Sequence, residues 1–240
     1  MTNAIVIGAR GRMGQLVRAS LEADGSFAVV GGYDVDNIDE LDELAPAADL
    51  VIDFSRPEAL PHVLAYVRRT GAALVSGTTG LTADDLAELK SLGDGSSVVW
   101  SSNYSLGVAV LRRLAAQAAE ALEGWDIEIV ETHHNKKADA PSGTAKALLA
   151  AVDPTSACTV ANGREGIVGE RPAREIGMHA LRGGTVAGTH EVHLFGVDEE
   201  VCLTHRATSR QIFVSGAIAC AKRLLEREAG FYSFDELMFA

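Results

Sequence analysis

Hydrophobic positions in the first hundred residues form short runs that alternate with stretches of helical spacing. The apolar runs that have the length of buried strands lie at residues 4–7, 28–30, 50–52, 73–75 and 98–100. After the first run, apolar side chains recur with the period of a helix at Met13, Leu16, Val17 and Leu21. Strands that alternate with helices are typical of a parallel sheet with right-handed crossovers. We therefore predict an α/β fold with a Rossmann-type, doubly wound parallel sheet in this part of the chain.

The pattern changes after about residue 104. It predicts an amphipathic helix at 106–122, a strand at 127–130, a short helix at 142–151, and alternating strands at 189–195 and 201–206. The polar, irregular segment 158–174 is expected to be a loop or lid, and a helical pattern at 213–225 is expected to pack back on the first domain. We predict a dinucleotide-binding domain from residues 1–104 and 213–240, and a second α+β domain with a mixed sheet over 105–212.

Two predicted helix starts carry residues that can cap a helix, the first of them as a capping box, in which two side chains satisfy backbone N–H groups at the helix start. Ser55 and Glu58 form the first pair, and Pro57 suits the first helical turn. Thr82 and Asp85 form the second pair. Both follow loops at the carboxyl ends of predicted strands, which is where such sheets bind ligands.

The loop after the first strand contains glycines spaced as GxxGxxG rather than GxGxxG, in the sequence Gly8-Ala9-Arg10-Gly11-Arg12-Met13-Gly14. Such a turn lets the backbone approach a pyrophosphate, and the following helix offers N–H donors and a favourable dipole. Asp34 lies 20 residues after Gly14, at the end of the second strand, where an acid that binds the ribose is expected. The alternative is a purely structural glycine turn. The place between strand and helix, together with Asp34, favours dinucleotide binding.

The choice between the two dinucleotides depends on a few charges. Asp34 would accept hydrogen bonds from the ribose hydroxyls of NADH and would repel the 2′-phosphate of NADPH. Val35 offers that phosphate no positive charge. Arg10 and Arg12 could reach it, or they could be solvated loop charges, and the sequence leaves both interpretations open. We expect NADH to be used well and leave the use of NADPH open.

Residues 131–145 form the segment with the most chemistry, Glu-Thr-His-His-Asn-Lys-Lys-Ala-Asp-Ala-Pro-Ser-Gly-Thr-Ala. It follows a predicted strand and places His133 and His134 next to Lys136 and Lys137. Imidazole donates or accepts a proton near neutral pH, and lysines are natural partners for a carboxylate substrate. A lone histidine has an ordinary structural explanation, whereas this combination predicts a catalytic loop.

The end of the same segment opens a helix. Gly143 and Thr144 lie at its N-terminus, where backbone N–H groups and a hydroxyl can bind an anion. Ser142 or Asp139 could cap this helix without any role in binding. The segment thus predicts a proton-transfer group beside an anion site.

Composition excludes several other classes of ligand. The formal net charge of −12 argues against a nucleic-acid partner, although it allows small anions where positive charge is local. The cysteines, Cys158, Cys202 and Cys220, are far apart and suggest neither a disulfide framework nor a zinc site. Adjacent histidines on an extended chain point in different directions, so we predict no metal site. Without a membrane-spanning run or a signal peptide, we expect a soluble, cytoplasmic protein.

Several longer motifs occur in one order along the chain: GARGRMG, VIDFSRPE, SGTTG, SSNYSLGV, EIVETHHNKKADAPSGTA, LRGGTVAGTHEV and THRATSRQIFVSGAI. From residue 4 to about 225 the chain resembles the 4-hydroxy-tetrahydrodipicolinate reductase family. The double-histidine segment is specific to that family. The resemblance implies NADH- or NADPH-dependent reduction of a cyclic imine dicarboxylate in diaminopimelate and lysine biosynthesis. Hydride would reach a ring carbon, and the adjacent carbon would then be protonated.

The resemblance also assigns roles to residues. His133 matches the family's proton donor, Lys137 a second donor, and His134, Gly143 and Thr144 match positions that hold substrate carboxylates. The positions that match cofactor-binding residues are Gly8, Ala9, Arg10, Gly11, Arg12, Met13, Asp34, Gly77, Thr78, Thr79, Ser101, Ser102, Asn103 and Tyr104. Some members carry a basic residue after the ribose-binding acid, where this chain has Val35. Members are typically homotetramers assembled through the sheet of the second domain.

Two other functions are compatible with a dinucleotide-binding chain. A related reductase of the same architecture, such as an aspartate or homoserine-type dehydrogenase, is not expected to carry His133-His134 with the turn at 139–144. A non-catalytic NAD-binding regulator would bind nucleotide without turnover, yet the chain contains every residue that the chemistry needs.

Overall fold

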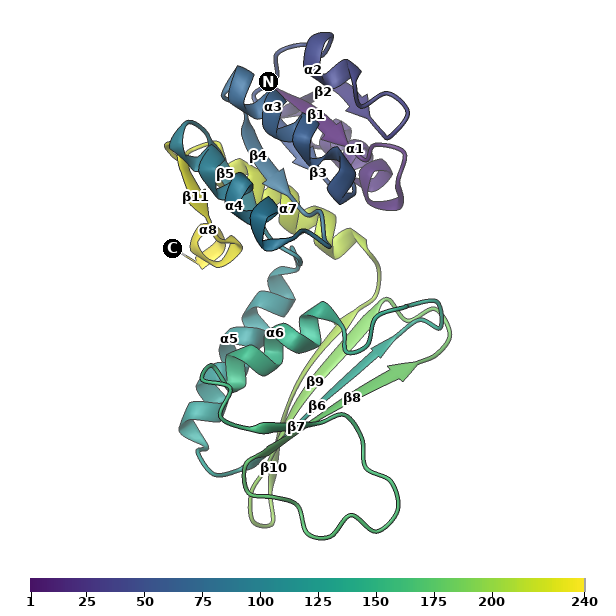
Figure 1. The fold of residues 1–240 in the computed structure, drawn as a ribbon, viewed down its shortest axis with the longest axis vertical. Helices are drawn as coiled ribbons and strands as arrows, with labels where there is room; N and C mark the ends of the chain where they lie inside the picture. Colours follow the sequence, from purple (N-terminus) through teal and green to yellow (C-terminus); the bar gives the residue numbers. More distant parts are fainter. Residues whose placement is uncertain (240) are drawn as a thin grey trace. The chain divides into compact units, whose positions relative to one another are not determined.

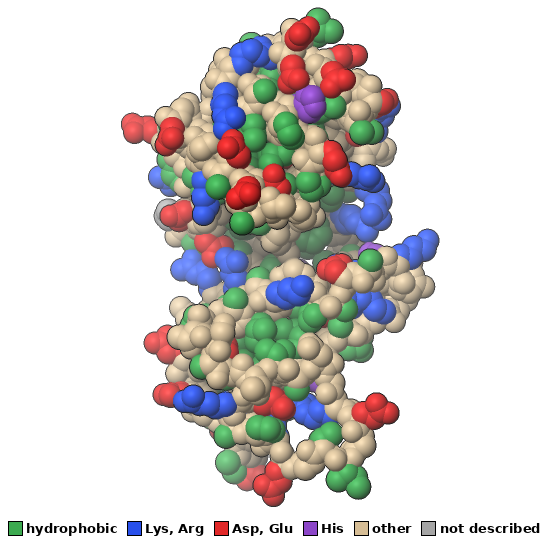
Figure 2. All heavy atoms as spheres, in the orientation of Figure 1, with side chains coloured by type: hydrophobic (Ala, Val, Ile, Leu, Met, Phe, Trp, Pro, Cys, Tyr) green, Lys and Arg blue, Asp and Glu red, His purple; other side chains and the backbone are tan. Residues whose placement is uncertain are grey.

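The computed structural model describes residues 1–239 and divides the chain into two compact units. Unit 1 consists of Met1–Leu106 and Gln211–Ala240, and unit 2 of Gly107–Arg210 (Figure 1). Each boundary lies two residues from the one drawn from the sequence. Figure 2 shows acidic side chains scattered over the visible face of both units, as the net charge of −12 leads one to expect. Within residues 1–239, no helix combines the length and the apolar character needed to cross a membrane.

Unit 1 is built on one parallel sheet. Its strands are β1 (Thr2–Ile7), β2 (Phe27–Tyr33), β3 (Leu50–Asp53), β4 (Ala73–Ser76), β5 (Ser97–Trp100) and β11 (Gly230–Tyr232). In the described chain they pair in the order β11-β5-β4-β3-β1-β2, all in parallel. The chain leaves β1 for β2 on one side and later reaches β3 on the other, which creates a switch point between β1 and β3. The predicted Rossmann-type sheet is confirmed, and β11 was not predicted.

Helices cover both faces of this sheet. They are α1 (Arg12–Asp24), α2 (Glu40–Glu43), α3 (Leu60–Thr70), α4 (Ala83–Ser91), α7 (Gln211–Leu224) and α8 (Phe234–Phe239), with short 3-10 turns at Pro57–Ala59 and Leu92–Asp94. Figure 1 shows α3 and α4 in front of the sheet and α7 behind it. Helix α7 packs against α1, β4 and β5 of unit 1, where the sequence analysis expected this segment to pack.

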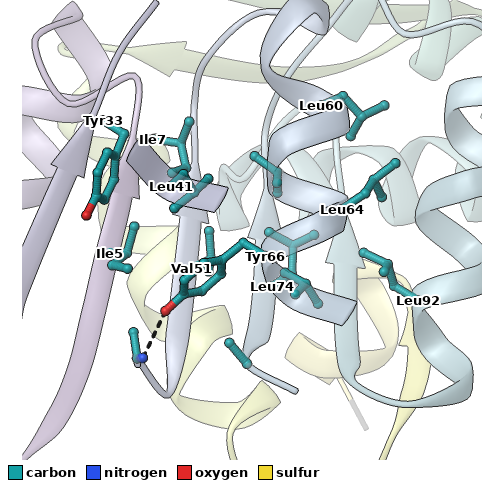
Figure 3. Close-up of a cluster of buried hydrophobic side chains, with 14 of the residues drawn as sticks. Ile5, Ile7, Tyr33, Leu41, Val51, Leu60, Leu64, Tyr66, Leu74 and Leu92 are labelled. Carbon is teal, nitrogen blue, oxygen red and sulfur yellow. Dashed lines mark hydrogen bonds between the residues drawn. The ribbon is translucent and has the colours of Figure 1, made fainter. Parts of the chain in front are cut away.

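One hydrophobic core lies between the sheet and α2, α3 and α4 (Figure 3). Alternate residues of the strands face it, including Ile5, Ile7, Val51, Leu74 and Val98, because successive side chains of a strand point to opposite faces. Tyr66 lies within this core with its ring fully buried. Its hydroxyl donates to the Pro46 carbonyl at 2.7 Å and accepts from the Ala48 N–H at 2.9 Å. The only polar atom of this side chain is thus satisfied.

Only one of the two predicted helix caps is present. The Thr82 side chain accepts from the Asp85 N–H and the Asp85 carboxylate accepts from the Thr82 N–H, as predicted. The box of Ser55 and Glu58 is wrong, since the 3-10 turn begins after Arg56 without a capping side chain among the described residues. Ser55 instead donates its hydroxyl to the buried Asp53 carboxylate at 2.5 Å. A buried carboxylate needs donors more than an exposed helix end does.

Unit 2 contains a mixed sheet. Its elements are α5 (Leu106–Ala121), β6 (Asp126–His133), α6 (Gly143–Val152), β7 (Thr159–Ala161), β8 (Glu175–Arg182), β9 (Gly188–Phe195) and β10 (Glu200–Ala207). The strands that the structure describes pair in the order β10-β9-β6-β8-β7. β9 runs antiparallel to β10 and β6, while β8 runs parallel to β6 and β7. The predicted second α+β domain with a mixed sheet is confirmed.

Within residues 1–239, helices pack on only one face of this sheet. Figure 1 shows α5 and α6 on the same side, where Leu111 and Leu148 meet Ile129, Val192 and other inward-facing strand residues. The opposite face, which we call the outer face, carries polar side chains and ion pairs. They include the cluster of Glu128 with Arg164, Arg171 and His179.

Two expectations for unit 2 were incomplete. The strand β8 was not predicted, and β7 lies inside the segment 158–174 that was expected to be irregular. Gly177 weakens the strand pattern of β8, because glycine has no side chain to pack. A Cβ at this position would overlap the end of the Glu128 side chain, so a larger residue here would force Glu128 to move. Strand β6 also continues three residues beyond the predicted end and includes His133.

Candidate active site

The glycine turn connects β1 to α1 and is hydrogen-bonded to the end of β2. Gly8 adopts a φ of +76°, and its N–H donates to the Tyr33 carbonyl at 2.8 Å. A Cβ on Gly14 would overlap the Gly8 carbonyl oxygen, so only glycine lets α1 start this close to the turn. Gly11 precedes α1 with no side-chain cap from residues 1–239, which leaves the first N–H groups of the helix for a ligand. The other residues of the turn differ in exposure: Ala9 is buried, Met13 is half-buried and Arg12 is exposed.

The acidic residue at the end of β2 is tied to the same turn. Asp34 accepts a hydrogen bond from the Arg10 N–H at 2.8 Å and a longer one from Arg10 Nε at 3.4 Å. The Arg10 guanidinium also pairs with Asp36. Hydrogen bonds from Arg10 to Asp36, and then to Asp34, raise the pKa of this guanidinium. The Arg10 guanidinium is therefore bound by two carboxylates. The 2′-phosphate of NADPH would have to compete with them for this positive charge.

Asp53, at the end of β3, organises two neighbouring loops and was not singled out in the sequence. Its carboxylate is buried and accepts from the Ser55 N–H at 3.0 Å, from Ser76 Oγ at 3.0 Å and from Thr78 Oγ1 at 2.8 Å. Burial raises the pKa of Asp53, while these donors act in the opposite direction. The carboxylate thus holds the loops after β3 and β4 in one arrangement.

The predicted cofactor residues after β4 and β5 divide into structural and accessible groups. Thr78 is buried with its hydroxyl committed to Asp53, whereas Thr79 is exposed and Gly77 is half-buried. Tyr104 is also buried, and its hydroxyl donates to the Ser76 carbonyl at 2.7 Å, so any ligand contact must come from its backbone. The residues of the loop before it are accessible: Ser102 is exposed, and Ser101 and Asn103 are half-buried. Because the strands are parallel neighbours, all these loops meet along one edge of the sheet.

In unit 2, His133 is the last residue of β6, and a carboxylate binds one nitrogen of its ring. Its Nδ1 lies 2.5 Å from Glu131 Oε2, and Glu131 is fully buried. Arg182 donates to both oxygens of the same carboxylate, at 2.9 and 2.8 Å. Burial by itself would raise the pKa of Glu131, but the hydrogen bonds from Arg182 and His133 outweigh it and hold the pKa below its usual value. An ionised carboxylate only accepts hydrogen bonds, so Nδ1 carries a proton.

The turn after His133 is fixed by backbone hydrogen bonds to the loop before β9. The His134 N–H donates to the Val186 carbonyl at 2.8 Å, and His134 Nδ1 accepts from the Lys136 N–H at 3.2 Å. Lys137 donates its Nζ to Asp139 at 2.7 Å, and this ion pair lowers the pKa of the Asp139 carboxyl. The ammonium group is therefore positioned in the same turn as both histidines.

The start of α6 lies against the same buried carboxylate. Ser142 donates its N–H to Glu131 Oε1 at 2.9 Å, and its hydroxyl accepts from the Ala145 N–H at 3.2 Å. The predicted cap by Ser142 is confirmed. Gly143 and Thr144 follow as the first residues of a ten-residue helix, where backbone N–H groups favour an anion.

A second histidine, His190 of β9, packs against His133 edge to face at 5.2 Å between ring centroids. Its Nε2 lies 3.2 Å from the Ser142 hydroxyl. Burial, and then the electrostatic effect of the neighbouring His133, lower the pKa of His190 to about 4, so the His190 ring is neutral at pH 7. Its Nδ1 has no hydrogen-bond partner within the described chain.

The family model described as the N-terminus of dihydrodipicolinate reductase matches residues 2–104, and the model of its C-terminus matches residues 107–238. The chain belongs to the dihydrodipicolinate reductase family. The resemblance inferred from the motifs is confirmed, and the match extends beyond residue 225 to the C-terminal segment.

Relatives of this family cover the chain from end to end. The 4-hydroxy-tetrahydrodipicolinate reductase of Natronomonas pharaonis is 41% identical over 244 residues, covering 98% of this chain and 99% of that protein. The enzyme of the same name from Campylobacter lari is 39% identical, covering 99% of each chain. The dipicolinate-bound dihydrodipicolinate reductase from Paenisporosarcina sp. TG-14 has the same fold, with a TM-score of 0.80, 20% identity and full coverage of both chains.

Within this dihydrodipicolinate reductase fold, some residues near His133 were missed in the sequence. Glu131 carried a signal, because residues two apart on a strand share a face and an acid among inward-facing apolar residues needs a partner. Gly188 had none: its φ is +156°, and a Cβ there would lie 3.1 Å from His133 Nε2. Its missing side chain keeps that nitrogen accessible.

One group of metal-ligand side chains lies elsewhere, on the outer face of the unit 2 sheet. Among the residues that the structure describes, His193, Glu200 and Cys202 place one ligand atom each within 4.8 Å of one another. His193 already pairs with Glu200 through Nδ1, which accounts for the proximity without an ion. The prediction that the chain has no metal site stays a prediction.

Proposed function

We propose that this chain catalyses the NADH- or NADPH-dependent reduction of 4-hydroxy-tetrahydrodipicolinate, by way of dihydrodipicolinate, to tetrahydrodipicolinate. The reaction belongs to diaminopimelate and lysine biosynthesis. Membership of the dihydrodipicolinate reductase family, with relatives near 40% identity over the full chain, supports the activity. One observation carries this proposal: the Nδ1 of His133 is paired with a buried carboxylate, and Lys137 lies in the turn that follows His133.

Unit 1 provides the residues that fit the dinucleotide. The uncapped start of α1 and the glycine turn suit the pyrophosphate, and Asp34 at the end of β2 suits the ribose hydroxyls. When bound, the reduced nicotinamide supplies the hydride. Since Arg10 already pairs with Asp34 and Asp36, we expect NADH to be used at least as well as NADPH. The family resemblance also names cofactor positions in the loops after β4 and β5. We propose that these loops contact the dinucleotide through their accessible backbone and side chains.

Unit 2 provides the proton and the anion site. Hydride addition to the ring leaves a carbanion-like centre on the adjacent carbon, and His133 would donate a proton to it from Nε2. Lys137 would act as a second donor and stabilise negative charge on the substrate. The N–H groups of Gly143 and Thr144 at the start of α6, with His134, would hold the carboxylates. A dianionic ligand thus finds local positive charge in an acidic protein.

We also propose a homotetramer that assembles through the outer face of the unit 2 sheet. In the described chain, α5 and α6 pack on the opposite face, while Leu181 and Phe195 on the outer face are 49% and 40% exposed. Light scattering coupled to size-exclusion chromatography tests this directly, and a monomer at micromolar concentration would contradict it. A cytoplasmic location is proposed from the biosynthetic role and the free cysteines, and cell fractionation tests it.

The deciding experiment is a coupled assay in which a dihydrodipicolinate synthase supplies fresh substrate. Oxidation of NADH or NADPH that requires the synthase product supports the function, and the ratio of the two rates measures the preference. His133→Gln should keep dinucleotide binding and lose most of the turnover. His179→Gln, a histidine on the outer face of the same sheet, is the matched control and should keep it. Dinucleotide binding without any oxidation would refute the proposed activity.

A further inference from the structure

The Glu131 carboxylate accepts more hydrogen bonds than an ion pair with one arginine would require. Its Oε2 accepts from His133 Nδ1 at 2.5 Å and from Arg182 Nη1 at 2.9 Å. Its Oε1 accepts from Arg182 Nη2 at 2.8 Å and from the Ser142 N–H at 2.9 Å. Four donors therefore occupy its lone pairs, and no exposed surface remains on the side chain.

The same carboxylate connects the proposed proton donor with the proposed anion site. Ser142 is the N-cap of α6, and the Arg182 guanidinium also donates to the Asp139 carbonyl at 2.7 Å. Strand pairing explains the meeting: His133 and Arg182 are register partners on β6 and β8, and Glu131 lies two residues before His133 on the same face. One buried group thus fixes the ring of His133, the helix start and the turn between them.

A purely structural ion pair is the alternative explanation. Removing two charges from water costs several kcal/mol, and a buried pair of this kind often stabilises a fold no better than apolar side chains of the same volume. A structural pair also does not require a histidine as a third member. The contact to Nδ1 is the one that has a chemical consequence, because it decides which ring nitrogen carries the transferable proton.

We infer that Glu131 is the positioning residue for His133: it holds the Nδ1–H of the ring so that Nε2 carries the proton delivered to the substrate. The inference rests on the proposed function, in which His133 is the proton donor. In the step, the Nε2–H bond breaks and its electron pair stays on nitrogen. The proton joins the substrate carbon, and a neutral ring with Nδ1–H remains bound to the Glu131 carboxylate. Arg182 keeps that carboxylate ionised throughout.

The test is Glu131→Gln. A glutamine side chain offers one accepting oxygen and one donating NH2 group. Arg182 and the Ser142 N–H can only donate and will take the oxygen, so the NH2 group will face His133 Nδ1 and oppose a proton there. In serine proteases the equivalent change from Asp to Asn lowers kcat by about 10⁴-fold through the wrong tautomer. We expect kcat to fall by about 10²- to 10⁴-fold, with KM changed by less than about threefold.

The matched control is Glu128→Gln. Glu128 lies on the same strand and is also bound by arginines and a histidine, but it faces the outer side of the sheet. This variant should keep the parental kcat. Dinucleotide binding and the unfolding midpoint of both variants report whether the fold is retained.

Nitrogen NMR of the imidazole rings gives a readout that a merely structural role would not move. The ring signals of His133 are assigned by their absence from His133→Gln. In the parent protein the neutral ring should carry its proton on Nδ1, and in Glu131→Gln on Nε2. A loss of kcat with unchanged His133 signals, or a kcat within about threefold of the parent, would overturn the inference.

Two further outcomes are also decisive. If Glu131→Gln does not fold, Glu131→Asp keeps the charge for Arg182 but withdraws the carboxylate by about 1.5 Å, the length of one C–C bond. A parental kcat in Glu131→Asp then overturns the inference. If the parent protein does not turn over the substrate, the proposed function fails by itself, and the tautomer of His133 still decides whether Glu131 positions the ring.

Discussion

Replacing Gly188 by alanine should block the proposed proton donor without changing any charged side chain. The new Cβ would lie 3.1 Å from His133 Nε2 and 3.5 Å from both His133 Cδ2 and His190 Cε1. Relaxed contacts between non-bonded heavy atoms are about 3.5–4.0 Å, so the ring of His133 would have to retreat by a few tenths of an ångström. It has little room to do so, because Glu131 holds Nδ1 at 2.5 Å and His190 packs against its face.

The magnitude of the effect follows from the role of that nitrogen. General acid catalysis contributes about 10²- to 10⁴-fold to a rate, or about 3–5 kcal/mol of barrier. A methyl group that covers Nε2 removes most of that contribution, so kcat should fall by at least about 100-fold. The φ of +156° at Gly188 also costs alanine about 1–3 kcal/mol of stability, which is less than the 5–15 kcal/mol typical of a folded protein.

The assay is steady-state oxidation of NADH with saturating substrate, with dinucleotide binding measured separately. Gly183→Ala is the control, since among the described residues nothing lies within 4 Å of a Cβ at that position. It should keep the parental rate. A double mutant with His133→Gln isolates the mechanism: if Gly188→Ala acts only through His133, it should add no further loss. A parental kcat in Gly188→Ala, or losses that multiply in the double mutant, would refute the reasoning.

Three other changes test separate parts of the structure. Asp36→Asn removes one of the two carboxylates that hold Arg10, so the ratio of kcat/KM for NADPH to that for NADH should rise, as steady-state kinetics with both cofactors would show. Thr82→Ala removes a capping side chain far from the chemistry, and urea unfolding should show a loss of about 1 kcal/mol with kcat unchanged. Burial alone would raise the pKa of Glu128, but hydrogen bonds, first of all from Arg164, lower it to about 2. A lowered carboxyl pKa gives stability that is present above about pH 4.5, the ordinary value, and is lost as the pH falls toward about 2. Glu128→Gln should therefore flatten the acid limb of the stability curve measured by denaturant unfolding, and an unchanged curve would argue against the ion-pair cluster.

The helices and strands of unit 1 were largely predictable, because buried parallel strands and amphipathic helices each leave a strong local period. The misses have local causes. The three-residue strand β11 is too short for a period, and Gly177 weakens the pattern in β8. The failed box at Ser55 shows that a buried carboxylate can take a capping residue away from a nearby helix.

The amino-acid sequence by itself determined most of the elements, the Rossmann-type sheet and the family, and it singled out His133 and Lys137 as candidate catalytic side chains. These follow from short-range periodicity and from motifs whose residues are neighbours in the chain. Only the tertiary structure decided which groups surround His133. Arg182 is separated from Glu131 by 51 residues and meets it through the register of β6 and β8. Gly188 matters only because β9 brings its backbone against Nε2. Hydrogen bonds of a buried carboxylate and van der Waals contacts act over a few ångströms, so their partners are set by strand pairing and not by spacing along the chain.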